Sequence, residues 1–329
     1  MNRKRFSDKY SYLCILCLTI TLISVSCGGG GGGTSNSSPP PISYSGLTTQ
    51  ATISQDNATN ISEEAYEGGT FAATLGTSVS VVLVPKEENR IGHSLPLELP
   101  QIFENSLNKI NWESGKILAG AIISKNDTIP GNCGGSGSYS ITVNDQTGDF
   151  TGQIIYNNYC EDNIIMSGGV GISGRININT LIFITLNFYF DGVTLTQGGI
   201  SATIKGDVYT NVSGSTVTVT ENLLLKDNTT NKVYWCKDYS LTVIKGVNYK
   251  DFTLSGTYYQ PDYGYVTIST RTPFRVDSGY TTPSSGVLMF TGDGNTSALL
   301  TVLSSSTYHI QADTNGDTIY DWDSGTLYW

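Results

Sequence analysis

An acidic cluster near the C-terminal end of the sequence has the residue types, and part of the spacing, of a calcium-binding loop. Oxygen-bearing side chains occupy positions one, three, five and nine of such a loop, namely Asp313, Asn315, Asp317 and Asp321. The glycine expected at position six is replaced by Thr318, and the bidentate acid expected at position twelve is replaced by Ser324. The pattern therefore favours a β-hairpin that turns at Asn315 and Gly316, with the acids on its solvated face. Calcium is the weaker alternative, and no other cofactor is predicted.

Four tyrosines around Pro261 form a second candidate site. They lie at the end of a predicted hairpin: Tyr258, Tyr259, Tyr263 and Tyr265. Aromatic rings beside a carboxylate such as Asp262 can hold a ligand, for example a sugar. Tyrosine is also a favoured cross-strand residue, which packs on the face of a sheet. The sequence favours packing and leaves contact with a glycan or a partner open.

No catalytic arrangement is visible in the sequence. A nucleophile activated by histidine would need His93 or His309 as its base. His309 lies in an alternating stretch, where an outward-facing strand residue is the simpler interpretation, and His93 lies in a predicted loop. Outside residues 1–26 there is no pair of cysteines with the spacing of a metal site. We therefore predict a protein that is not an enzyme and that holds no metal.

The first 26 residues have the organisation of a bacterial export signal. A basic start precedes an apolar run from Tyr12 to Val25, which is too short for a comfortable bilayer crossing and is followed by Cys27. This segment resembles the lipobox of bacterial lipoproteins, whose cysteine is acylated and becomes the new N-terminus. The resemblance implies that Cys27 is lipidated, although Ser24 stands where such boxes usually have leucine. Gly28 follows the cysteine where lipoproteins retained at the inner membrane often have aspartate, so the outer membrane is the expected address.

Residues 27–46 are expected to form a tether between the lipid and the folded body. Six glycines from Gly28 to Gly33 lead into serines and then into Pro39–Pro41. Such a composition cannot bury apolar surface, and about fifteen residues of it span on the order of 20 Å.

The net charge of the whole chain is −10. Residues 1–26 are basic overall, so the mature chain is more acidic still. A surface of this sign repels phosphate backbones, and nucleic acid is therefore excluded as an expected partner. Attachment to the membrane is predicted to come from the covalent lipid.

Residues 47–128 are predicted to be helical or mixed. Asn60 and Glu63 have the spacing of a capping box, at the start of a helix expected to end near Gly76. The β-branched stretch 78–85 predicts a strand, and a second helix is expected to begin near Pro100.

Residues 129–329 are predicted to form a large antiparallel meander of about a dozen strands. Short runs rich in Val, Ile, Thr and Tyr alternate with Gly, Asn and Asp turns, without room for crossover helices. The fold class is mainly β, and the sheet is expected to be curved, to split into a sandwich, or to form a half-barrel. A closed membrane barrel is a less favoured alternative, because the strands show no clear apolar outward band. The run 181–190 is apolar on both faces, which suits a buried central strand or the lining of a lipid pocket.

A disulfide is predicted between Cys133 and Cys160, with Cys236 unpaired. Residues 144–149 ("NDQTGD") are the expected turn of a hairpin that folds about Gln146 to Gly148 and whose two ends bring these cysteines together. The alternative pair, Cys160 with Cys236, would require strands distant in sequence to be neighbours.

Several motifs together resemble a family of uncharacterised bacterial lipoproteins. They include the cysteine followed by polyglycine, "CGGSGSYSITVNDQTGDFTG", "VYWCKDYSLT" and the closing "ADTNGDTIYDWDSGTLYW". The likeness implies the fold and the envelope location but no activity. The sequence therefore predicts a lipid-anchored envelope protein with a binding or surface-structural role, whose partner is another envelope protein, a glycan or a lipid. The alternative is a carrier of a lipid or other apolar ligand.

Overall fold

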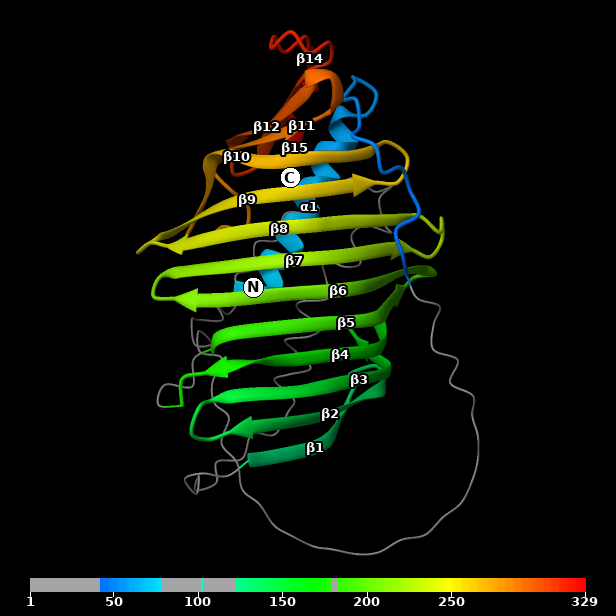
Figure 1. Ribbon diagram of the computed structural model, residues 1–329, viewed down its shortest axis with the longest axis vertical. Coiled ribbons are helices and arrows are strands. Elements are labelled where there is room, and N and C mark those ends of the chain that lie inside the picture. Colours follow the sequence, from blue (N-terminus) through cyan, green and yellow to red (C-terminus); the bar gives the residue numbers. More distant parts are fainter. Residues whose placement is uncertain (1–41, 78–101, 103–121, 179–182) are drawn as a thin grey trace, which may run out of the picture.

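A computed structural model describes residues 42–77, 102, 122–178 and 183–329 (Figure 1). The elements are α1 (Ala58–Thr77), β1 (Ile122–Pro130), β2 (Gly134–Asn144), β3 (Asp149–Glu161), β4 (Ile164–Ile176), β5 (Phe183–Gln197), β6 (Ile200–Ser213), β7 (Thr216–Asp227), β8 (Val233–Lys245), β9 (Tyr249–Gln260), β10 (Gly264–Asp277), β11 (Ser285–Thr291), β12 (Ser297–Ser304), β13 (Thr307–Asp313), β14 (Trp322–Asp323) and β15 (Leu327–Tyr328). The protein is mainly β, as predicted.

Fifteen strands of the described residues form one antiparallel sheet. Strands β1 to β14 follow one another in chain order, and β15 pairs with β13. This is the predicted meander, and the described strands do not close into a ring. Of the expected shapes, the structure has a curved, open sheet (Figure 1).

The first strand, β1, was not predicted. Its sequence "IISKNDTIP" lacks an alternating apolar pattern, and the strand is held by continuous pairing with β2 from Ile122 to Pro130. It therefore crosses the boundary that the sequence analysis set between residues 128 and 129. The predicted strand at 78–85 and the predicted second helix, apart from Ile102, lie outside the described residues.

Helix α1 begins at Ala58, so the predicted cap at Asn60 is wrong and Asn60 lies in the first turn. Asn57 closes the preceding turn instead: its Oδ1 accepts from the Ser54 amide (2.8 Å), and its Nδ2 donates to the Thr52 carbonyl (3.0 Å). Glu63, the expected partner of that cap, is buried and accepts a hydrogen bond from the Tyr308 hydroxyl (2.5 Å).

The sheet curls around α1. The helix contacts the central strands β6 to β9 and also β12 and β13, which the sheet brings over it (Figure 1). On this inner face the fully buried ring of Tyr66 lies between Phe274 and Trp329, with centroid distances of 5.3 and 5.6 Å. Helix α1 and the inner faces of β6 to β9, β12 and β13 therefore enclose part of the core.

A line of irregular positions crosses the strands and gives the sheet its curvature. Register shifts occur in β3, β4, β5, β8, β9 and β10, where β-bulges bend a strand and increase its twist. In β6 the corresponding residue is Gly206, whose φ of +130° is a conformation that side chains rarely adopt. A Cβ there would collide with the carbonyl oxygen of Asn222 on β7.

The segment before α1 is part of the fold. Gln50 forms a parallel bridge with Tyr265 of β10, and the Ala51 amide donates to the Tyr265 carbonyl (2.8 Å). Tyr44, within the expected tether, packs 5.4 Å from the ring of Tyr259. Residues 44–46 therefore contact the sheet.

The predicted disulfide between Cys133 and Cys160 is confirmed, with a Cα–Cα distance of 5.0 Å. It lies where the β2–β3 hairpin opens, because Gly134 pairs with Cys160. Cys236 is free, as predicted.

Replacing Gly206 with alanine is expected to destabilise the fold by about 2 kcal/mol or more, since the new Cβ meets a carbonyl oxygen of the neighbouring strand at a strained φ. Gly171→Ala is the matched control, because β4 keeps an ordinary backbone there and the nearest atom is 3.5 Å away. Chemical denaturation of both variants tests this. Equal losses of stability in the two variants would contradict the role of the irregular positions in curving the sheet.

Candidate functional site

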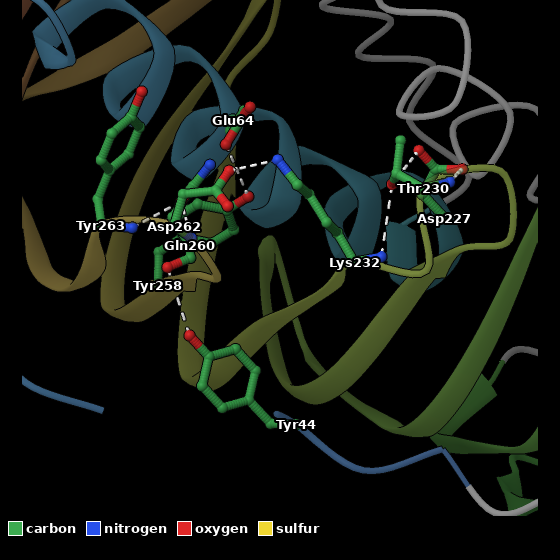
Figure 2. Close-up of polar contacts among 9 residues, drawn as sticks. All are labelled: Tyr44, Glu64, Asp227, Thr230, Lys232, Tyr258, Gln260, Asp262 and Tyr263. Carbon is green, nitrogen blue, oxygen red and sulfur yellow. Dashed lines mark hydrogen bonds and ion pairs between the residues drawn. The ribbon is translucent and has the colours of Figure 1, made fainter. Parts of the chain in front are cut away.

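A group of polar side chains lies where β7, β8 and β9 meet the first half of α1 (Figure 2). The β7–β8 loop and the β9–β10 loop lie side by side and are joined by an ion pair between Lys232 Nζ and Asp262 Oδ2 at 2.5 Å. Both side chains are roughly half exposed, so the pair contributes little to stability by itself. Its consequence is positional, because it joins the two loops.

Each of the two loops is held by a side chain that accepts backbone hydrogen bonds. Asp227 accepts from the Thr229 amide (2.8 Å) and from the Thr230 hydroxyl (2.7 Å). Gln260 Oε1 accepts from the amides of residues 262 and 263, at 2.6 and 3.0 Å. Such local bonds fix turn geometry. They set the positions of Lys232 and Asp262 (Figure 2).

Beneath these loops lies a small apolar cavity of about 50 Å³ between α1 and strands β6 to β9. Its walls include Phe71, Leu223 and Tyr234, and Glu64 and Tyr258 also line it. The Tyr258 hydroxyl and Glu64 Oε2 are 3.3 Å apart. A space of this size holds a few water-sized groups, far less than the several hundred cubic ångströms of a typical ligand pocket.

Buried tyrosines anchor α1 to the sheet. The Tyr239 hydroxyl donates to the Ala65 carbonyl (3.0 Å), beside the contacts of Tyr258 with Glu64 and of Tyr308 with Glu63. Burial raises the pKa of Tyr258 and of Tyr239 well above the usual value, and nearby Glu64 acts in the same direction on Tyr258. The hydroxyls therefore keep their protons as donors.

Glu221 is a buried acid without a hydrogen-bond partner. It points to the inner face of β7, paired in register with Val208 and Tyr239, and both carboxyl oxygens are inaccessible and unbonded. Burial raises its pKa well above the usual value, so the carboxyl is held neutral. Burial and then Glu221 raise the pKa of the neighbouring Cys236 thiol, which is therefore a poor nucleophile. Glu221 was not predicted as a site residue, because only the strand register shows that it faces the core.

The four predicted site tyrosines do not form one site. Tyr258 is buried under α1, whereas Tyr259 and Tyr265 face the opposite side of the sheet, and Tyr263 packs against the edge of the core. On the outer face Tyr259 lies between Trp235 (4.8 Å) and Tyr265 (5.1 Å). These rings stack on one another across three strands, which is the packing alternative of the sequence analysis. The sequence did not predict that Trp235 and Tyr44 pack beside these rings, because their positions depend on the pairing register of distant segments.

The acidic cluster forms the loop between β13 and β14. Gln311 pairs with Asp323, so the two strands are antiparallel neighbours as predicted, but they are joined by the loop 314–321 and not by a turn at Asn315 and Gly316. The prediction that Asp313 lies on a solvated face is also wrong, because Asp313 is buried. Its buried carboxylate accepts from the amides of residues 316, 317 and 318, at 2.7, 3.2 and 2.8 Å. Asn315 and Asp317 bond local amides, and Asp321 accepts from Thr314. Asp313 therefore organises the loop, and the part of the chain that the structure describes holds no group of three or more acidic, histidine or cysteine side chains arranged for a metal.

Two other predictions concern single strands. The expected burial of 181–190 on both faces is wrong within the described residues: Phe188 and Phe190 are buried, but Ile184 and Tyr189 on the other face are 37 and 48% exposed. The reason is that the sheet is a single layer with a solvated outer face. His309 lies in β13 with Nδ1 3.4 Å from Asp323 Oδ2, and His93 lies outside the described residues.

Comparisons with protein-family models, with curated proteins and with solved structures find no match for this chain. The likeness to a lipoprotein family therefore stays a prediction. Within the described ranges, no helix has the length and apolarity needed to cross a bilayer.

Glu221→Gln is expected to flatten the pH dependence of stability. The unfolded chain ionises this carboxyl near its ordinary value of 4.5, whereas the folded protein holds the proton to a higher pH. The stability of the wild type should therefore fall as pH rises above about 4.5, by up to about 1.4 kcal/mol per pH unit from this group. The stability of Glu221→Gln should fall less as pH rises, because the glutamine does not ionise. Denaturation between pH 5 and 8 measures it, with exposed Asp191→Asn as control; parallel profiles for wild type and Glu221→Gln would refute the assignment.

Proposed function

We propose that this chain is an exported envelope lipoprotein that is anchored through Cys27 and acts by binding or by surface structure, without catalysis. The observation that carries the proposal is that α1 occupies the inner side of the curved sheet, held by buried contacts with Tyr239, Tyr258 and Tyr308. At β6 to β9, β12 and β13 the inner face is occupied by α1, so contacts with a partner in this part of the protein fall to the solvated outer face and to the loops. The basic and apolar start of the sequence and the glycine run after Cys27 support the anchoring.

The proposed address is the outer membrane of a bacterium, with an envelope protein, a glycan or a lipid as the partner. The tether is shorter than residues 27–46, because Tyr44 already contacts Trp235 and Tyr259. The acidic net charge supports the exclusion of nucleic acid.

Cys27→Ser is expected to abolish fatty-acid labelling and to move the protein from the membrane fraction to the soluble fraction, because the thiol is the acylated atom in this proposal. The measurement is metabolic labelling followed by fractionation in a bacterial host. Ser26→Ala is the control and should keep both the label and the location. A Cys27→Ser protein that stays membrane-bound would refute the anchoring.

A second candidate function, a carrier of an apolar ligand, is favoured by one observation, the apolar cavity under α1. At about 50 Å³ it admits an acyl chain only after α1 moves. Gly68 allows this movement to be blocked, because a Cβ at this position would meet Sγ of Cys236. In Gly68→Cys, oxidation should bridge residues 68 and 236 and lock the helix.

We expect the purified protein to hold no stoichiometric lipid by mass spectrometry, before or after oxidation of Gly68→Cys. The double variant Gly68→Cys/Cys236→Ala cannot form the bridge and serves as control. One bound lipid per chain, lost only in the oxidised Gly68→Cys protein, would establish the carrier and overturn the proposed binding role.

A further inference from the structure

The β8–β9 hairpin tip, residues 244–250, combines exposed apolar side chains with unpaired positive charge. Val247 at its apex is 95% exposed, and Ile244 and Tyr249 beside it are 51 and 38% exposed. Tyr280 of the neighbouring β10–β11 loop adds a further ring that is 59% exposed. Exposed valine at the apex of a turn contributes nothing to the core, so the fold gives no reason for it.

The positive charge lies on the same tip. Lys245 and Lys250 stand directly opposite each other in the register of β8 and β9, an arrangement of like charges that destabilises a sheet. No carboxylate forms an ion pair with either lysine in the described part of the chain. The nearby acids have other partners: Asp251 is bound by Arg275 at 2.8 and 2.9 Å, and Asp277 accepts from Ser284. Burial, and then Lys245, lower the pKa of Lys250, as expected for two cations without an anion between them.

Arg275 completes the tip. Its guanidinium lies 4.1 Å from the ring of Tyr249 while it holds Asp251. This stacking fixes the aromatic ring at the side of the hairpin. The hairpin therefore exposes a valine at its apex, with a tyrosine and two lysines next to the apex.

We infer that the β8–β9 tip docks on an anionic lipid bilayer. The apolar apex suits the acyl boundary, tyrosine and lysine suit the interface, and the paired lysines are complementary to acidic headgroups. A membrane is favoured over a protein partner because a single convex hairpin offers far less than the roughly 800 Å² that a stable protein interface takes from each side. The whole chain has a net charge of −10, so two adjacent lysines form a local exception to its acidic character.

The position of the tip makes this contact additional to the anchor. Tyr44, where the tether meets the body, packs on Trp235 near the start of β8, whereas the tip follows the end of that thirteen-residue strand. Ten residues of strand separate Trp235 from Lys245, which is about 33 Å at roughly 3.3 Å per residue. The tip therefore contacts lipid independently of Cys27.

The test uses the mature chain with Cys27→Ala, which removes the lipid, in sedimentation with vesicles of phosphatidylcholine alone or mixed with phosphatidylglycerol. We expect binding to the anionic vesicles that weakens at 1 M salt. Lys245→Glu/Lys250→Glu should weaken binding by roughly thirtyfold or more. Val247→Ser should weaken binding both at low salt and at 1 M salt. The matched control, Lys205→Glu/Lys226→Glu, makes the same charge change away from the tip and should retain most of the binding.

Three results would overturn the inference: no binding of the wild type to anionic vesicles, equal losses in the tip and control variants, or sedimentation without vesicles that Val247→Ser removes. The last result would assign the tip to a second copy of this chain. Circular dichroism of each variant establishes that the sheet is intact. Fatty-acid labelling at Cys27 is measured separately, so failure of the tip leaves the anchoring proposal standing.

Discussion

The packing of α1 against the inner face of the sheet is the interaction on which the rest of the structure depends. A single open sheet has one apolar face that must be covered, and α1 covers its centre by contacting β6 to β9, β12 and β13. Two glycines in the helix, Gly68 and Gly69, lie against the side chains of Cys236 and Leu254, which a Cβ would meet at 2.4 Å. Glycine inside a helix costs about 1 kcal/mol each in helix propensity, and this close approach to the sheet is what offsets the cost.

Polar contacts give that packing a single orientation. Three consecutive residues of α1, from Glu63 to Ala65, receive hydroxyls from three different strands. A helix bonded at three points can neither rotate nor slide without leaving buried polar groups unsatisfied. The irregular positions in β8, β9 and β10 complete the arrangement, because they curve the part of the sheet in which both β8 and β13 contact one helix.

The sequence predicted those features that depend on neighbours along the chain. Alternating runs and turn residues predicted β2 to β13 in order, and hairpin geometry predicted the bond between Cys133 and Cys160. Features that depend on distant residues were missed: Tyr308 and Glu63 are 245 positions apart, and nothing local pairs them. Bulges were also invisible, although each one changes which face the following side chains occupy. The candidate site of Figure 2, the inward orientation of Glu221 and the row of Trp235 with Tyr259 all follow from such register.

The central claim is that α1 is a permanent part of the core and not a lid. Native-state hydrogen exchange of the mature chain tests it most directly, because it reports the free energy of opening for each amide. The account predicts that amides in the middle of α1, from Ala65 to Gly69, exchange only through global unfolding, as slowly as those of β7 and β8. Exchange in α1 that is orders of magnitude faster, while β7 and β8 stay protected, would show that the helix opens alone and would contradict the account.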